Sequence, residues 1–233
     1  VLDGNNYIFG SSNMVSFDPS INGASSNFAM GQYALQGLTD GVSNISMGTF
    51  SMQSAVTSSV SFNIGIGDSS LYSLTEGTLN TALGYGTLIS LTTGDENTAI
   101  GPNALQGLSV GGANFAAGPN ALGAMGTGSS NMGIGSGAGF SIDGASYNIA
   151  IGPLAMYGAT NSDSSIAIGY QAMFGGGGGG NNIALSTGAL SSLTTGSLNF
   201  GAMPNALNSL ADGTYNLAIG GSSQFYNVHG SNN

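Results

Sequence analysis

A seventeen-residue unit, N-x-A-I-G-x-x-A-L-x-x-L-T-x-G-x-x, repeats through almost the whole chain and restricts its fold more than any other feature. The copies begin at Asn6, Asn27, Asn44, Asn63, Asn80, Asn97, Asn114, Asn131, Asn148, Ser165, Asn182, Asn199 and Asn216. Successive starts are 21, 17 and 19 residues apart and then follow nine intervals of 17, and one further step from Asn216 reaches Asn233. Such a period is typical of a solenoid, in which each unit buries its apolar side only against its neighbours. The sequence therefore predicts a single elongated repeat domain over residues 6–233, with about thirteen coils, after a lead-in segment at 1–5.

Each repeat divides into a strand and a turn segment. In the copy that starts at Asn97, residues 97–101 alternate and end in glycine, which predicts a short strand. The following segment, 102–108, carries Ala104, Leu105 and Leu108 at spacings of three and four, which favours a short helical or 3₁₀ turn, although a strand is compatible with so short a stretch. Glycines then recur where the chain must turn back: Gly77, Gly94, Gly111, Gly128, Gly179, Gly196 and Gly213. The predicted fold class is an all-β dominated solenoid of stacked parallel strands. Each coil has a glycine corner directly after its strand, as at Gly101.

The three inner strand positions form columns of different size. The fourth repeat position is apolar in every copy, and we expect it to form the hydrophobic core: Phe9, Met30, Met47, Ile66, Leu83, Ile100, Ala117, Ile134, Ile151, Ile168, Leu185, Ala202 and Ile219. The second position is mostly apolar and shares that face, as in Phe28, Ile45, Ile64, Phe115, Met132, Ile149, Ile166, Ile183, Phe200 and Leu217. The third position, on the opposite face, is almost always tiny: Ala29, Ser46, Gly65, Ala82, Ala99, Ala116, Gly133, Ala150, Ala167, Ala184, Gly201 and Ala218.

A column of tiny residues predicts close approach of another backbone, most simply a further copy of the same chain. The alternative is a thin solenoid whose small residues face its own interior, with the large residues facing outward toward a partner. Either arrangement leaves an apolar face on a single chain, so both predict a homo-oligomer, either a trimer or a filament.

The leading asparagine is the most regular polar residue of the repeat. Because equal repeat positions lie above one another in a stack, successive Asn side chains are expected to hydrogen-bond along the solenoid as an internal ladder. Three copies are irregular, with four extra residues around Asp18-Pro19, two extra between Asn44 and Asn63, and an all-glycine stretch at 175–180. These are predicted surface loops.

Charge composition excludes several classes of partner. The 233 residues contain no Lys or Arg, ten acidic residues and one His, giving a formal net charge of -10. Nucleic acid is therefore excluded as a partner, and so is an anionic membrane surface. Cysteine is absent, and no apolar run approaches the ~20 residues of a membrane span. The chain starts at Val1 without a basic or apolar leader, which favours a processed chain or a fragment.

No residue set points to catalysis, to a cofactor or to a bound metal, and we expect no enzyme. The glycines of 133–137 lack the lysine of a phosphate-binding loop, and His229, the single imidazole, has no Ser or Asp at a catalytic spacing. Acidic residues fall mostly in turns, where they solvate a neutral surface: Asp68, Glu76, Asp95, Glu96, Asp143, Asp163 and Asp212. Calcium binding by such a turn stays open, although the glycine-rich nonapeptide of calcium-binding β-rolls is missing. Several tyrosines at variable turn positions could stack on sugars: Tyr33, Tyr72, Tyr85, Tyr157, Tyr170 and Tyr226.

Three segments carry a family resemblance. Residues 80–86 (NTALGYG), 97–101 (NTAIG) and 166–173 (IAIGYQAM) resemble the N-T-A-I-G-Y-x-A-L repeats of phage tail fibres and bacterial surface proteins, and more distantly the head repeats of trimeric autotransporter adhesins. The resemblance covers residues 6–233 and implies an extracellular, cell-surface or virion fibre that is β-rich and oligomeric. The adhesin repeat is shorter, and these 233 residues contain no segment that resembles a coiled-coil stalk, a membrane anchor or a chaperone-like terminal domain.

The expected function is that of a non-enzymatic structural fibre, a shaft or self-stacking filament that contacts surfaces. Because the repeat runs almost to both ends of the sequence, we expect either a piece of a longer fibre or subunits that stack end to end. The alternative is a surface-binding adhesin or receptor-binding tail-fibre module that recognises a glycan or, less in keeping with the sequence, ice. Ice binding calls for a regular threonine column, yet the second strand position has threonine only at Thr81 and Thr98.

Overall fold

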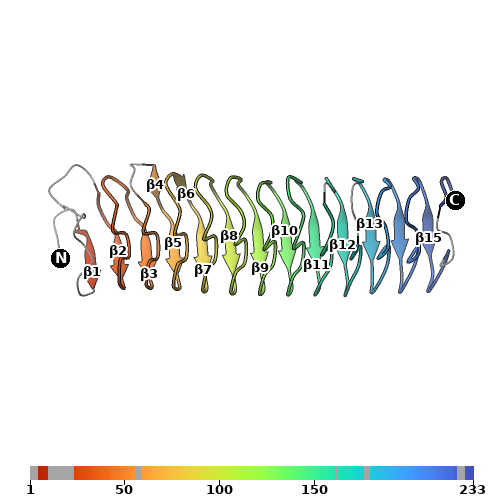
Figure 1. Cartoon of the computed structure of the whole chain (residues 1–233), viewed down its shortest axis with the longest axis horizontal. Helices are drawn as coiled ribbons and strands as arrows, with labels where there is room; N and C mark the ends of the chain where they lie inside the picture. The colour runs from red at the N-terminus through yellow and green to blue at the C-terminus, as the bar shows by residue number, and fades with distance from the viewer. Residues whose placement is uncertain (1–4, 10–23, 56–58, 161, 176–178, 225–228) are drawn as a thin grey trace. The chain divides into compact units, whose positions relative to one another are not determined.

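The computed structural model describes residues 5–9, 24–55, 59–160, 162–175, 179–224 and 229–233. The chain divides into two compact units, Val1–Asn114 and Phe115–Asn233. Each unit is a β-solenoid whose short parallel strands lie side by side in chain order (Figure 1). The predicted fold class is confirmed, whereas the grouping of all coils into one domain stays a prediction.

The first unit contains two ladders of parallel strands. Its main sheet runs in the order β1 (Tyr7–Phe9), β2 (Phe28–Met30), β3 (Ile45–Met47), β5 (Ile64–Ile66), β7 (Thr81–Leu83) and β8 (Thr98–Ile100). A second, shorter pair joins β4 (Val60–Ser61) to β6 (Gly77–Thr78) on the return segment of the coil. Single parallel bridges continue that return ladder from Glu76 to Thr93 and from Thr93 to Val110.

The second unit repeats this arrangement with one sheet. Its strands pair in sequence order and in parallel: β9 (Phe115–Ala117), β10 (Met132–Ile134), β11 (Ile149–Ile151), β12 (Ile166–Ile168), β13 (Ile183–Leu185), β14 (Phe200–Ala202) and β15 (Leu217–Ile219). Ile149 pairs with Ile166 and Ala150 with Ala167, so each residue lies beside the residue 17 positions later. The repeat period is therefore also the register of the sheet.

The core lies on the side of the strand that carries the small residues, which corrects our first interpretation of the columns. Ala99 and Ala150 in the third position are fully buried, whereas Ile100 in the fourth position is 41% exposed. The interior is filled instead from the turn segment, by residues such as Ala104, Leu105 and Leu108. Because these side chains already occupy the narrow space within a coil, the inward strand position carries only Ala, Gly or Ser from Ala29 onward, and the one large residue of the column, Ile8, lies in the first strand. The small residues thus face the interior of the coil and the large ones face outward, as in the thin-solenoid alternative, whereas the partner of the outward face stays a prediction.

The turn segment contains no helix in any of its described residues, so the predicted helical or 3₁₀ turn is wrong. Residues 102–107 form consecutive turns closed by hydrogen bonds from Ala104 N to Gly101 O and from Leu108 N to Leu105 O, each 3.2 Å long. Asn103 and Leu105 have φ angles of 57° and 52°, which a right-handed helix does not allow. Residues in the left-handed conformation, Asn103 and Leu105, alternate here with residues that are not left-handed. The directions of successive side chains therefore differ from those in a helix, and the neighbours Ala104 and Leu105 both lie in the core.

The predicted asparagine ladder is present in both units. In the first unit the Oδ1 atom of Asn80 accepts hydrogen bonds from the backbone N and the Nδ2 of Asn97, both 3.0 Å long. The Nδ2 of Asn80 donates to Asn63 Oδ1 at 3.0 Å and to the carbonyl of Gly94 at 2.7 Å, where the chain turns back toward the next strand. These amides are fully buried. Each asparagine therefore joins two neighbouring coils and also closes its own coil.

Several predictions lie outside the described residues or concern absences. The insertion around Asp18-Pro19, residues 56–58 between Asn44 and Asn63, and Gly176–Gly178 of the glycine run are not described. The described part of the chain contains no helix that is long and apolar enough to cross a membrane.

Candidate interaction surface

The outward side of each strand ladder carries large apolar side chains. We call this surface the strand face and define it by the second and fourth repeat positions. In the second unit it consists of Phe115, Ala117, Met132, Ile134, Ile149, Ile151, Ile166, Ile168, Ile183, Leu185, Phe200, Ala202, Leu217 and Ile219. In the first unit it consists of Tyr7, Phe9, Phe28, Met30, Ile45, Met47, Ile64, Ile66, Thr81, Leu83, Thr98 and Ile100.

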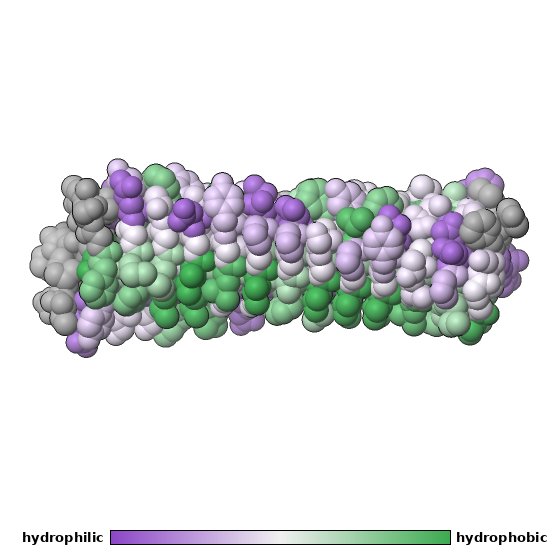
Figure 2. All heavy atoms as spheres, turned by 90° about the horizontal axis from the view of Figure 1, so that it is seen from below, coloured by the Kyte–Doolittle hydropathy of each residue, from purple (hydrophilic) through white to green (hydrophobic). Residues whose placement is uncertain are grey.

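The strand face is partly exposed to solvent and uncharged. Met30, Ile66 and Ile168 are about 40% exposed, and the other members are mostly intermediate in burial. Apolar surface gathers along one side of each unit in Figure 2, and polar surface gathers beside it. No position of the strand face is occupied by an acidic residue. Contiguous apolar patches of this kind mark interaction surfaces in soluble proteins.

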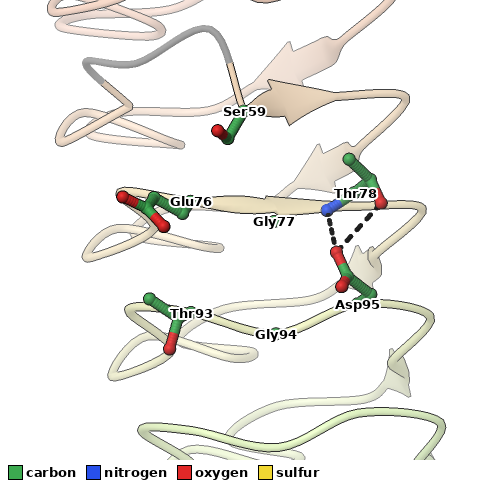
Figure 3. A pocket seen from close by; sticks show the side chains of 7 residues that line it. All are labelled: Ser59, Glu76, Gly77, Thr78, Thr93, Gly94 and Asp95. Atoms are coloured by element: carbon green, nitrogen blue, oxygen red, sulfur yellow. Dashed lines mark hydrogen bonds between the residues drawn. The ribbon is translucent and has the colours of Figure 1, made fainter.

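Four aspartates of the turns, Asp68, Asp95, Asp143 and Asp163, accept hydrogen bonds from backbone amides of the preceding coil. Asp95 accepts hydrogen bonds from the N and Oγ1 atoms of Thr78, at 2.7 and 2.9 Å (Figure 3). Asp143 accepts from the backbone N atoms of Gly126 and Thr127, and Asp163 accepts from Ser146 N. These carboxylates satisfy donors that the strand ladder leaves unpaired. Surface solvation, the role expected from the sequence, is thus accompanied by a structural one.

One shallow pocket of about 410 Å³ lies beside this region of the first unit, lined by Ser59, Glu76, Gly77, Thr78, Thr93, Gly94 and Asp95. Its carboxylates come from two successive coils, and Figure 3 shows Asp95 directed toward Thr78. Among the described residues, no group of three or more His, Cys, Asp or Glu side chains could hold a metal ion.

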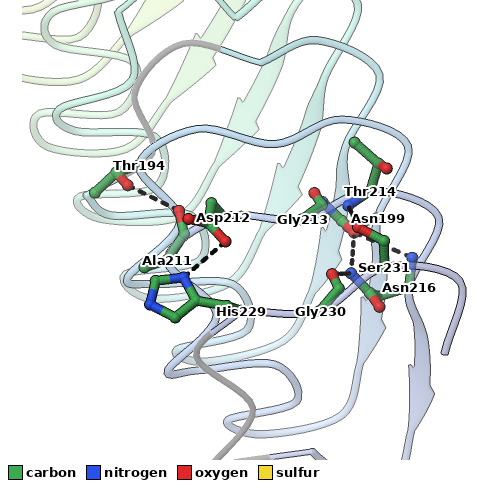
Figure 4. A network of polar contacts seen from close by, with 10 residues as sticks. All are labelled: Thr194, Asn199, Ala211, Asp212, Gly213, Thr214, Asn216, His229, Gly230 and Ser231. Carbon is green, nitrogen blue, oxygen red and sulfur yellow. Dashed lines mark hydrogen bonds and ion pairs between the residues drawn. The ribbon is translucent and has the colours of Figure 1, made fainter.

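His229 has a partner that sequence spacing did not single out. Its Nδ1 atom lies 2.8 Å from Oδ1 of Asp212, and the two residues form a parallel bridge of the return ladder (Figure 4). The sequence does contain a signal for this contact, because residues 212 and 229 are one repeat period of 17 residues apart. Both side chains are at least half exposed, and Asp212 is the one hydrogen-bond partner of His229 in the described part of the chain. A hydroxyl group within reach of the imidazole, which a catalytic triad needs, is not part of this contact.

Aromatic side chains stack along each unit on the turn segment. In the first unit the rings of Tyr33 and Phe50 are 5.0 Å apart and nearly parallel. In the second unit Phe140, Tyr157 and Phe174 form a continuous stack, with centroids separated by 5.1 and 5.5 Å. Of the tyrosines that the sequence suggested for sugar contact, Tyr33 and Tyr157 are in such stacks. Tyr85 and Tyr170 are exposed near the glycine corner, and Tyr226 lies outside the described residues.

Comparison with known proteins gives no relative for this chain. It matches no protein-family model, and neither the curated proteins nor the solved structures contain a significant match.

Proposed function

We propose that the chain is a non-enzymatic structural protein that associates with copies of itself through the strand face and forms part of a rigid fibre outside the cell or on a virion. One observation carries the proposal: each unit displays an uncharged row of mostly large apolar side chains, at the spacing of its strand ladder, in which Thr81, Thr98, Ala117 and Ala202 are the polar or small members. Covering this row removes apolar surface from water, at about 25 cal/mol per Å².

The interior of the protein supports a mechanical role. Within each unit the backbone ladders, the asparagine ladder and the packed leucines join successive coils, so stiffness comes from many similar contacts. A second copy is the partner that fits best, because its own strand face has the same period and the same lack of charge. The localisation rests on the sequence resemblance to tail-fibre and surface-fibre repeats.

A matched pair of charge variants tests the proposal. In the double variant Ile134→Asp/Ile168→Asp, two strand-face residues from alternate coils become charged, so that burial against a partner is strongly unfavourable. The control, Thr187→Asp/Ser192→Asp, adds the same charge at exposed residues of the turn segment in the same unit. Sedimentation velocity should show the unmodified chain and the control as an oligomer, and the strand-face variant as a monomer with an unchanged circular dichroism spectrum.

Electron micrographs of the unmodified chain then distinguish discrete rods, expected for a trimer, from concentration-dependent filaments. A chain that is monomeric at all concentrations, or an oligomer that survives both strand-face charges, would rule out association through this surface.

A further inference from the structure

We propose that a notch on the turn segments of the second unit binds a single uncharged sugar ring. The notch has a volume of about 310 Å³ and is lined by Asn120, Ser136, Gly137, Phe140, Leu154 and Tyr157. Small-molecule sites usually measure about 300–1,000 Å³, so this one is at the lower end of the range and suits a single sugar ring. It shares no residue with the strand face, and the inference is therefore independent of self-association.

Two breaks in the repeat columns create the notch. At the seventh repeat position, Gly137 stands between Asn120 and Leu154, so one coil lacks a side chain there. At the tenth position the chain changes from Gly123 to the aromatic Phe140 and Tyr157, and a Cβ atom on Gly123 would lie 2.9 Å from the Phe140 ring. The ring of Phe140 thus lies over a coil that has no side chain of its own at that position.

The apolar wall of the notch consists of ring edges and Leu154. The rings of Phe140 and Tyr157 are within 9° of parallel, and those of Tyr157 and Phe174 within 10°, so the three rings cover one another's faces. Their edges carry partial positive charge and attract hydroxyl oxygen atoms. Leu154 offers apolar surface to the C–H groups of a sugar ring.

The polar wall consists of neutral groups that both donate and accept hydrogen bonds. The side chains of Asn120 and Ser136 are exposed and make no hydrogen bond within the described residues. An amide and a hydroxyl together match the donor and acceptor pattern of sugar hydroxyls. An aromatic side chain of another protein would displace water from the Asn120 amide and the Ser136 hydroxyl but could not replace the hydrogen bonds that water makes with them. This loss disfavours an aromatic side chain as the ligand of the notch.

The charge of the site selects against anionic ligands. No Asp, Glu or His lines the notch, and the chain has no Lys or Arg to pair with a phosphate, a sulfate or a carboxylate. A neutral hexose or N-acetylhexosamine therefore fits better than a sialic acid or a phosphorylated sugar.

Saturation-transfer NMR with millimolar methyl glycosides of glucose, galactose, mannose and N-acetylglucosamine tests the site. Asn120 has a φ angle of 55°, so Asn120→Gly removes the amide and keeps the backbone conformation; Ser136→Ala removes the hydroxyl. Asn103→Gly is the matched control, because Asn103 occupies the same repeat position in the first unit with a φ angle of 57°. At least one neutral glycoside should bind, about tenfold more weakly in either notch variant and unchanged in the control.

Sialic acid and N-acetyltyrosine amide serve as comparison probes. The proposal is overturned if no neutral glycoside binds, if binding is equal in all variants, or if either comparison probe binds better than every neutral glycoside. Sedimentation of the same variants separates this result from the proposed function, because Asn120→Gly and Ser136→Ala leave the strand face intact.

Discussion

At the scale of single residues, the leading asparagine has more structural roles than any other side chain of the repeat. Its Oδ1 accepts from two donors of the next coil, and its Nδ2 donates both to the previous coil and to the carbonyl that ends its own coil. A buried polar group whose hydrogen bonds are all made rigidifies the interior of a protein. A buried polar group that loses a hydrogen-bond partner lowers the stability of the fold. This explains why only one copy departs from asparagine.

That exception, Ser165, shows how the ladder adapts. The Oγ atom of Ser165 accepts only the backbone N of Asn182, at 3.2 Å. The Nδ2 of Asn182 donates instead to the carbonyls of Gly179 and Gly196, both at 2.8 Å. The side chain of Asn182 therefore satisfies the carbonyl that an asparagine at position 165 would have bound.

Replacement of Asn80 by alanine should destabilise the first unit by about 3 kcal/mol, because the backbone N of Asn97 and the carbonyl of Gly94 lose the partner that Asn80 provides and Nδ2 of Asn97 keeps only its bond to Gly111 O. Urea denaturation followed by circular dichroism measures the loss, and hydrogen exchange at the Asn97 amide should accelerate. Gln106→Ala, at an exposed residue of the turn segment, is the control and should change stability by less than about 0.5 kcal/mol. Equal stability of both variants would show that the amide ladder contributes nothing.

At the scale of the coil, sequence alone predicted the strands but not which side of them is inside. The period fixed the register, and alternation correctly placed Ala99 opposite Ile100. The alternation of side chains along a strand does not show which of the two faces is buried, because large apolar residues occur both in a hydrophobic core and at an interface with another chain. The decision depends on the packing of Leu105 and Leu108 into the interior, which depends in turn on left-handed turns that the sequence did not indicate.

The residue before each ladder asparagine illustrates this limit. Its φ angle is near 60° in residues as different as Phe62, Glu96 and Tyr147, none of which is a residue that favours this conformation. The conformation is held by contacts between coils, since the N of Glu96 donates to the carbonyl of Thr78 in the preceding coil, at 3.0 Å. Such a conformation is set by the stack and has no local sequence signal. The notch is equally hidden, because it arises from glycines and aromatic residues in three different coils.

The glycine corner that follows the strand gives a prediction at this scale. Gly169 and Gly220 occupy the same repeat position with the same φ angle of 133°, but a Cβ atom on Gly169 would lie 2.5 Å from the carbonyl carbon of Ser186. A Cβ atom on Gly220 has no described neighbour closer than 3.8 Å. Both alanine variants strain the backbone, and Gly169→Ala should lose about 2 kcal/mol more stability because of the added clash.

Thermal and urea denaturation of the two variants measure this difference. Because backbone strain is common to both, the difference reports the close approach of successive coils alone. Similar stabilities would mean that the stack can separate locally at Gly169 without cost.

At the scale of the whole molecule, the dominant properties are an apolar face and a single sign of charge. A formal net charge of -10 without Lys or Arg means that approaching copies repel each other while their strand faces attract. Ion pairs between Lys or Arg and acidic residues, which stabilise many interfaces, cannot form between two copies of this chain. Self-association must therefore come from apolar burial and backbone contacts, against an electrostatic cost.

This balance predicts an unusual dependence on salt. Raising the NaCl concentration from about 0.01 to 1 M shortens the screening length from about 30 to 3 Å and weakens the repulsion between copies. Association should therefore strengthen with salt, and sedimentation equilibrium should show a lower dissociation constant at each step. The control variant Thr187→Asp/Ser192→Asp carries additional negative charge and should depend on salt more steeply. Association that weakens as salt is added would indicate that attraction between opposite charges holds the copies together. Because the chain has no Lys or Arg to provide such attraction, this result would contradict the proposal, and the strand face would not be the interface.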